Sequence, residues 1–147
     1  MRLATIGVFF VVVFGASAGS ATGRYEGGDH KMLDGTWQLV EAELGGMKLP
    51  QTPGKTLKLI LKGAHYELVG AESPDEGRVK LFTDKSPKAM EIVGEKGPNK
   101  GKTFPAIYEL KDDMLTVCYN LGGAELPKEF ATKKGTQLFL AKYRKEK

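Results

Sequence analysis

The chain has 147 residues, of which 41% are apolar and 27% are charged, and this is typical of a single globular domain. The formal net charge of +4 is too mild to indicate a nucleic-acid-binding protein, and no interleaving of basic and aromatic residues supports one. A single cysteine, Cys118, excludes an internal disulfide, so the core alone must hold the fold.

Residues 1–18 are predicted to be a cleaved signal peptide. Arg2 supplies the positive start, residues 3–14 form an apolar run, and Ala16 and Ala18 are the small residues that a signal peptidase reads. The run is shorter than the roughly 20 apolar residues that span a bilayer, although an uncleaved anchor is the alternative. We therefore predict export, either periplasmic or secreted, after cleavage near Ala18.

The mature chain is expected to begin with a flexible leader, residues 19–30, because Gly, Ser and Thr are frequent there. The folded domain is predicted to cover residues 31–147. A short helical turn over residues 29–33 is expected to close one end of this domain, with His30 on its surface.

From Gly35 onward, apolar residues recur with a period of two, which predicts strands that each bury one face. Polar and glycine-rich segments separate the strands; one of them is the acidic segment at residues 75–77, which we interpret as a turn. The predicted strands cover residues 35–44, 56–62, 65–68, 78–81, 89–92, 104–110, 114–120 and 136–143.

These strands predict an all-β fold. No long helical pattern lies between them, so an antiparallel meander is favoured over a parallel sheet with helical crossovers. A sheet with one apolar face must hide that face, and closure into a barrel also removes exposed edges. We therefore predict a single antiparallel up-and-down β-barrel of about eight short strands. A barrel of this size is either filled with side chains or holds one small ligand.

The only tryptophan, Trp37, opens the first strand and is predicted to plug the core. Gly35, Thr36 and Trp37 resemble the Gly-x-Trp signature of lipocalins and their fatty-acid-binding relatives. The resemblance implies that Trp37 closes one end of the barrel. It also implies that a basic residue of the last strand, Arg144 or as second choice Lys142, lies over the indole.

A closer resemblance covers almost all of residues 34–145. The segments that carry it are residues 34–37, 48–50, 87–92, 97–103, 107–110, 115–119 and 127–130. In the order and spacing of these segments, the chain is similar to a family of uncharacterised exported lipocalin-like domains that is abundant in planctomycete bacteria. The resemblance implies a lipocalin-like barrel and an exported protein, but it brings no established activity and no functional residues.

No motif for catalysis, a metal or a cofactor is found in the sequence. The glycine-rich segment 97–103 is one residue short of a phosphate-binding loop, and a strand rather than a helix is predicted to follow it. His30 and His65 lack metal-ligand spacing, and the acidic segment 72–77 lacks the ligand order of a calcium loop. We therefore predict no metal, no cofactor and no enzymatic activity.

Two carboxylates leave an enzymatic alternative open. Glu67 or Glu109 would be a candidate acid if it faced the barrel lumen. Alternation with the neighbouring apolar residues favours solvent exposure for both. Cys118 is interpreted as a buried, inert thiol, and pairing between two chains is the alternative.

The leading functional hypothesis is a small-molecule-binding barrel in the cell envelope or outside it, and we expect a monomer. An apolar or amphipathic ligand fits a lumen lined by aromatic side chains. The alternative is a solid-core interaction or structural protein that acts through its loops and its basic C-terminal tail, formed by Lys142, Arg144, Lys145 and Lys147. Phe82 is a further aromatic residue available to the core. The candidate ligand-binding residues are Trp37, Tyr66, Tyr108, Tyr119 and Phe139.

Overall fold

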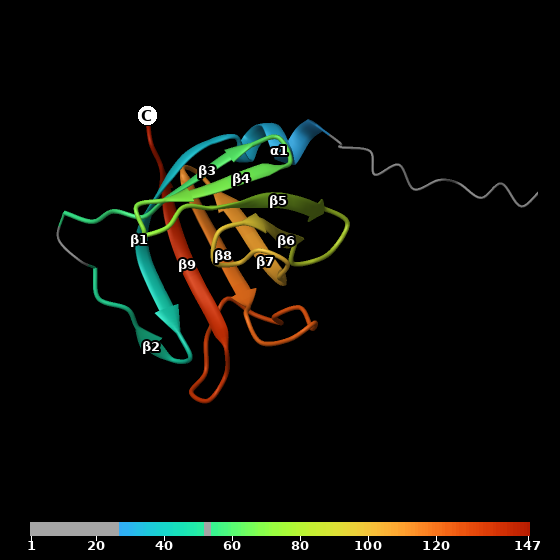
Figure 1. Ribbon diagram of the computed structural model, residues 1–147. Coiled ribbons are helices and arrows are strands. Elements are labelled where there is room, and N and C mark those ends of the chain that lie inside the picture. Colours follow the sequence, from blue (N-terminus) through green and yellow to red (C-terminus); the bar gives the residue numbers. More distant parts are fainter. Residues whose placement is uncertain (1–26, 52–53) are drawn as a thin grey trace, which may run out of the picture.

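The computed structural model describes residues 27–51 and 54–147, so the predicted signal peptide and most of the predicted leader lie outside the described residues (Figure 1). Within these ranges, no helix has the length and apolar character that crossing a membrane requires. The elements are α1 (Gly27–Leu33), β1 (Gly35–Leu44), β2 (Met47–Lys48), β3 (Lys58–Lys62), β4 (His65–Val69), β5 (Asp75–Phe82), β6 (Ala89–Lys96), β7 (Thr103–Lys111), β8 (Met114–Asn120) and β9 (Leu138–Lys145).

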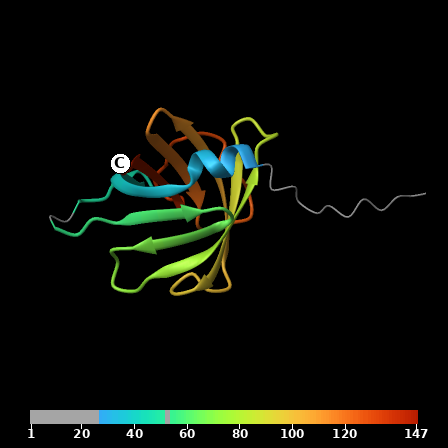
Figure 2. The same cartoon turned by 90° about the horizontal axis from the view of Figure 1, so that it is seen from above.

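The strands form one antiparallel sheet that closes on itself. The order β1-β3-β4-β5-β6-β7-β8-β9 follows the chain, and β9 returns to pair with β1 along most of its length. The short strand β2 adds a hairpin arm to the end of β1. The predicted all-β, up-and-down barrel is therefore confirmed, and Figure 2 shows it from above with α1 across the near end.

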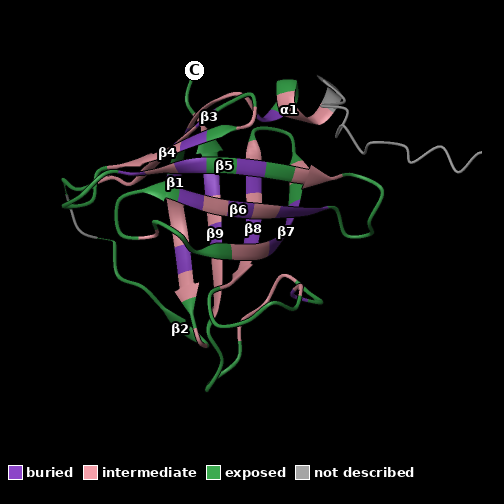
Figure 3. Ribbon diagram, turned by 45° about the vertical axis from the view of Figure 1, so that its right-hand side comes forward, coloured by how far each residue is buried: buried purple, intermediate pink, exposed green. Residues whose placement is uncertain are grey.

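The period-two pattern of the sequence is the physical basis of this closure. In β5, Val79 is buried while Arg78 and Lys80 on either side are exposed (Figure 3). Side chains that alternate in this way point to opposite faces of a strand, so each strand gives one row to the lumen. Trp37, Leu115 and their neighbours form the inner cluster that results.

The two ends of the barrel differ. The helix α1 lies at one end, as predicted for residues 29–33, while β2 and the β8–β9 connection lie at the other (Figure 1). The carboxylate of Asp34 accepts a hydrogen bond of 2.7 Å from the amide of Gly63, which ties the end of α1 to the β3–β4 turn. We call the end under α1 the closed end and the opposite end the open end.

A second, smaller cluster lies on the outer wall. Ala89, Ile107 and Cys118 are buried there beneath the β8–β9 connection. Phe82, considered available to the core from its sequence, packs on this outer cluster instead. Leu126, Phe130 and Leu140 also pack against it.

The interpretation of residues 75–77 as a turn is wrong, because these residues begin β5. Asp75 is 5% exposed and hydrogen-bonded, so a residue type that favours turns is held in the sheet by tertiary contacts. Gly77 is required for close approach: a Cβ added there would lie 1.9 Å from the carbonyl oxygen of Val93. Strand β2 was not predicted at all.

Candidate functional site: the barrel lumen and its open end

The lumen holds a cavity of about 480 Å³ on the open side of the barrel. Leu44 and Leu121 line it and are each 38% exposed, so the cavity reaches solvent at the open end of the barrel. The lining residues are Leu44, Leu59, Leu61, Tyr66, Leu68, Asp75, Val79, Met90, Ile92, Asn99, Lys102, Phe104, Leu115, Val117, Tyr119, Leu121, Phe139 and Tyr143.

The cavity wall comes directly from strand alternation. Leu115, Val117 and Tyr119 follow one another at a spacing of two along β8, and all three line the cavity. The residues between them turn outward, and Cys118 is one of these. The apolar wall is therefore a property of the sequence pattern, while the empty volume depends on how far the strands stand apart.

Two tyrosines place polar atoms inside the lumen. The hydroxyl oxygens of Tyr119 and Tyr143 lie 3.3 Å apart and share a hydrogen bond. Burial raises the pKa of Tyr143 to about 12 and holds the pKa of Tyr119 well above its ordinary value. Both phenols are therefore neutral at physiological pH, and they offer a ligand hydrogen bonds without charge.

A buried carboxylate organises the rim of the open end. Asp75 accepts hydrogen bonds from the side-chain amide of Asn99, at 2.7 Å, and from the hydroxyl of Tyr66, at 3.2 Å. The pKa of Tyr66 is raised, first by burial and then by the neighbouring Asp75. These contacts seat the β6–β7 loop closely on the start of β5: a Cβ added at Gly97 (φ +89°) would lie 2.3 Å from the carbonyl oxygen of Pro74.

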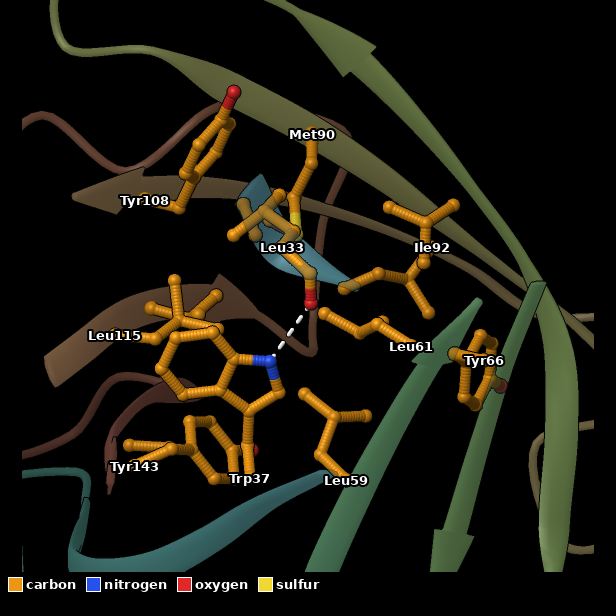
Figure 4. Packing of buried hydrophobic residues seen from close by; sticks show 14 of the residues in the cluster. Leu33, Trp37, Leu59, Leu61, Tyr66, Met90, Ile92, Tyr108, Leu115 and Tyr143 are labelled. Atoms are coloured by element: carbon orange, nitrogen blue, oxygen red, sulfur yellow. Dashed lines mark hydrogen bonds between the residues drawn. The ribbon is translucent and has the colours of Figure 1, made fainter. Parts of the chain in front are cut away.

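The closed end is sealed by Trp37, which is fully buried. Its indole nitrogen donates a hydrogen bond of 2.8 Å to the carbonyl oxygen of Leu33, the last residue of α1 (Figure 4). The ammonium group of Lys145 lies 5.5 Å from the centre of the indole, within the range of a cation–π contact.

The expectation that Arg144 or Lys142 covers the indole is wrong. Strand pairing places Trp37 opposite Lys145, so the two side chains share the inner face of the sheet. Arg144 is one residue removed and turns outward. Lys142 also faces outward, where its ammonium group lies 3.6 Å from the carboxylate of Glu41.

The structure does not bring the five predicted ligand-binding residues into one site. Tyr66, Tyr119 and Phe139 line the cavity. Trp37 lies in the closed end and is not part of the cavity wall. Tyr108 is buried nearby, and its hydroxyl donates a hydrogen bond of 2.7 Å to the carboxylate of Asp29.

Asp29 joins α1 to the barrel. Its carboxylate also lies 2.8 Å from the ammonium group of Lys88, and this hydrogen bond is the main reason why the pKa of Asp29 is lowered. The pKa of Tyr108 is raised by burial and then by Asp29. A smaller hollow of about 320 Å³ surrounds these groups; it is lined by Asp29, Met32, Leu33, Pro87, Lys88, Tyr108, Glu109, Leu110 and Phe130.

Neither glutamate that was considered as a lumen acid reaches the cavity. Glu67 lies between Tyr66 and Leu68, which both face the lumen, so its own side chain faces outward. Glu109 is exposed. Among the described residues, no group of three or more His, Cys, Asp or Glu side chains is placed to hold a metal ion.

Sequence reasoning missed four polar residues of the cavity: Asp75, Asn99, Lys102 and Tyr143. Alternation along the last strand was sufficient to find Tyr143, because it shares a face with Phe139. The contact between Asp75 and Asn99 had no such signal, since the fold brings together residues that are 24 positions apart.

Comparison of the chain with protein-family models, with curated proteins and with solved structures found no match.

Proposed function

We propose that the protein is an exported binding module that holds one small apolar or amphipathic molecule in the barrel lumen. The observation that carries this proposal is the open cavity of about 480 Å³. Small-molecule sites in proteins have volumes of roughly 300–1,000 Å³ and mostly apolar walls with a few placed polar groups. The described lumen fits both criteria.

The distribution of polar groups indicates how such a ligand lies. Charged groups of the cavity wall, Asp75 and Lys102, belong to the rim, while the interior polar atoms belong to the neutral pair Tyr119 and Tyr143. Placing a charge among these apolar side chains is costly unless it is paired. The ligand therefore has an apolar body inside the barrel, with any charged end at the mouth beside Lys102.

The predicted signal peptide supports an envelope or extracellular location for this activity. The resemblance to exported lipocalin-like domains supports the same location, and we propose that the chain belongs to that group. The ligand is then a molecule that is present outside the cytoplasm and poorly soluble in water.

The solid-core alternative receives less support. A filled barrel would leave no cavity of this size. Two residues of the basic tail that this alternative uses contact the barrel itself. The ammonium group of Lys142 lies near the carboxylate of Glu41, and that of Lys145 lies over the indole of Trp37. The cavity therefore favours ligand binding over a purely structural role.

A fluorescence titration with the neutral apolar dye N-phenyl-1-naphthylamine tests the proposal. The wild-type protein is expected to bind one equivalent. Val117→Phe fills the lumen and is expected to weaken binding by at least about tenfold. Thr116→Phe, which introduces the same side chain at the outward-facing neighbour in β8, is the matched control and is expected to bind like the wild type. Absence of binding by the wild type, or equal effects of both variants, would refute the proposal.

A further inference from the structure

Exposed large apolar side chains gather at the open end. Among the described residues, five large hydrophobic side chains are exposed, and Met32 on α1 is the one at the closed end. The other four lie at the open end, and we call them the apolar lip: Leu44, Met47, Leu49 and Leu121. Met47 is the most exposed of them, at 72%. Contiguous exposed apolar groups mark protein-binding or membrane-binding surfaces.

Strand pairing makes the lip continuous with the cavity. Met47 pairs with Leu44 across the β1–β2 hairpin, and the amide of Leu49 donates a hydrogen bond of 2.8 Å to the carbonyl of Ala42. Residues directly opposite on paired strands face the same side of a sheet. Because Leu44 faces the cavity, Met47 and Leu49 extend the apolar lumen wall beyond the barrel.

The loops around the lip carry a small surplus of available positive charge. Five lysines of these loops form no ion pair with any described residue, and one of them, Lys102, also lines the cavity; the five are Lys55, Lys100, Lys102, Lys128 and Lys134. The acidic residues of these loops that form no ion pair with any described residue are Glu72 and Glu125. A lysine near an anionic bilayer surface is attracted to it, so this surplus complements anionic lipid headgroups.

We propose that the apolar lip docks the open end of the barrel on a lipid bilayer that contains anionic headgroups. The cavity mouth lies within the lip, so a docked protein partner would seal it, whereas a bilayer supplies the apolar molecules that the cavity fits. The ligand then passes between bilayer and lumen without crossing water. The route of the ligand rests on the proposed function, and so does the argument against a docked protein partner; the exposed lip and the positive charge around it do not.

The docking surface differs from the one predicted from the sequence. The basic tail ends at the closed end, opposite β2 (Figure 1). When the apolar lip contacts the bilayer, Arg144 and Lys147 therefore lie on the side of the barrel that faces away from it. Variants at the two ends separate the two surfaces.

Co-sedimentation with phosphatidylcholine vesicles that contain phosphatidylglycerol tests the docking. Met47→Gln removes apolar surface from the lip and is expected to weaken vesicle binding about tenfold. Met32→Gln, the same change at an exposed methionine of the closed end, is the matched control and is expected to bind like the wild type. Vesicles of phosphatidylcholine alone are expected to bind the wild type more weakly.

Several outcomes would overturn the docking proposal. These are a wild-type protein that does not bind vesicles, equal effects of the two methionine variants, and a dimer in size-exclusion chromatography that Met47→Gln dissociates. The last result would assign the lip to a second copy of the chain. The two proposals fail separately: vesicle binding without dye binding refutes only the proposed function, and dye binding without vesicle binding refutes only the docking.

Discussion

The indole nitrogen of Trp37 donates its hydrogen bond to the carbonyl oxygen of Leu33, 2.8 Å away. Leu33 ends α1, where helix carbonyls have no intrahelical partner. The bond therefore satisfies two buried polar groups at once and fixes the helix over the closed end. As a result, the barrel is shut on one side, and its cavity has its entrance at the other.

Trp37→Phe is expected to lower the free energy of unfolding by about 2 kcal/mol, because it leaves a void and an unpaired carbonyl. Urea unfolding followed by far-UV circular dichroism measures the change without the lost tryptophan signal. Lys145→Gln, which removes only the cation over the ring, is the control and is expected to cost about 0.5 kcal/mol. An equal cost for both variants would show that the indole does not seal the end.

Asp75→Ala is expected to loosen the β6–β7 loop, since the side chain of Asn99 then loses its acceptor. Amide hydrogen exchange is the measurement, and we expect exchange in residues 97–102 to rise about tenfold. Asp113→Ala, in the turn at the other end of the barrel, is the control. Unchanged protection of the loop would mean that Asp75 does not hold it.

Stability is expected to fall at alkaline pH because of buried tyrosines. The pKa of Tyr143 in the folded protein is raised to about 12, above its ordinary value of 10.0. Its contribution to the free energy of unfolding is complete below pH 10. Between pH 10 and 12 the unfolded state loses the phenolic proton while the folded state keeps it, so this contribution falls by about 1.4 kcal/mol per pH unit. Urea unfolding at several pH values measures this loss. Tyr143→Phe is expected to make the pH dependence less steep by that amount, while Tyr66, Tyr108 and Tyr119, whose pKa values are also raised, keep the remainder. The same slope in the variant would contradict the assignment.

The thiol of Cys118 is expected to be inert in the folded protein. It is fully buried on the outer wall, and burial raises its pKa, which disfavours the reactive thiolate. Iodoacetamide is expected to label it only after unfolding in urea. Phe130→Ala, which opens the outer cluster, is expected to speed labelling. Rapid labelling of the native wild type would contradict this and would revive pairing between chains.

The architecture was predictable because its cause is local. A period of two in each segment, with glycine and polar turns between segments, specifies short antiparallel strands and forces closure. The position of Lys145 over Trp37 was missed because the basic residue was chosen from the resemblance to lipocalins. The alternation of inward and outward residues along the last strand was not used for this choice. Since Tyr143 faces inward, Lys145 faces inward as well, and Arg144 cannot.

The site was only partly predictable because it depends on contacts across the chain. Three aromatic residues of the cavity, Tyr66, Tyr119 and Phe139, follow from alternation alone. Asp75 was assigned to a turn because its sequence neighbours are acidic and glycine residues. Its position in the strand depends on Asn99 in a distant loop, and a local pattern contains no information about such a partner.

The most direct test of the central claim is methyl NMR of the protein titrated with N-phenyl-1-naphthylamine. Val117 and Leu59 line the cavity, whereas Ile107 is buried in the outer cluster. We predict that the methyl resonances of Val117 and Leu59 shift with saturation at one equivalent, while those of Ile107 do not move. Shifts confined to Ile107, or no shifts in any of the three residues, would contradict a ligand-binding lumen.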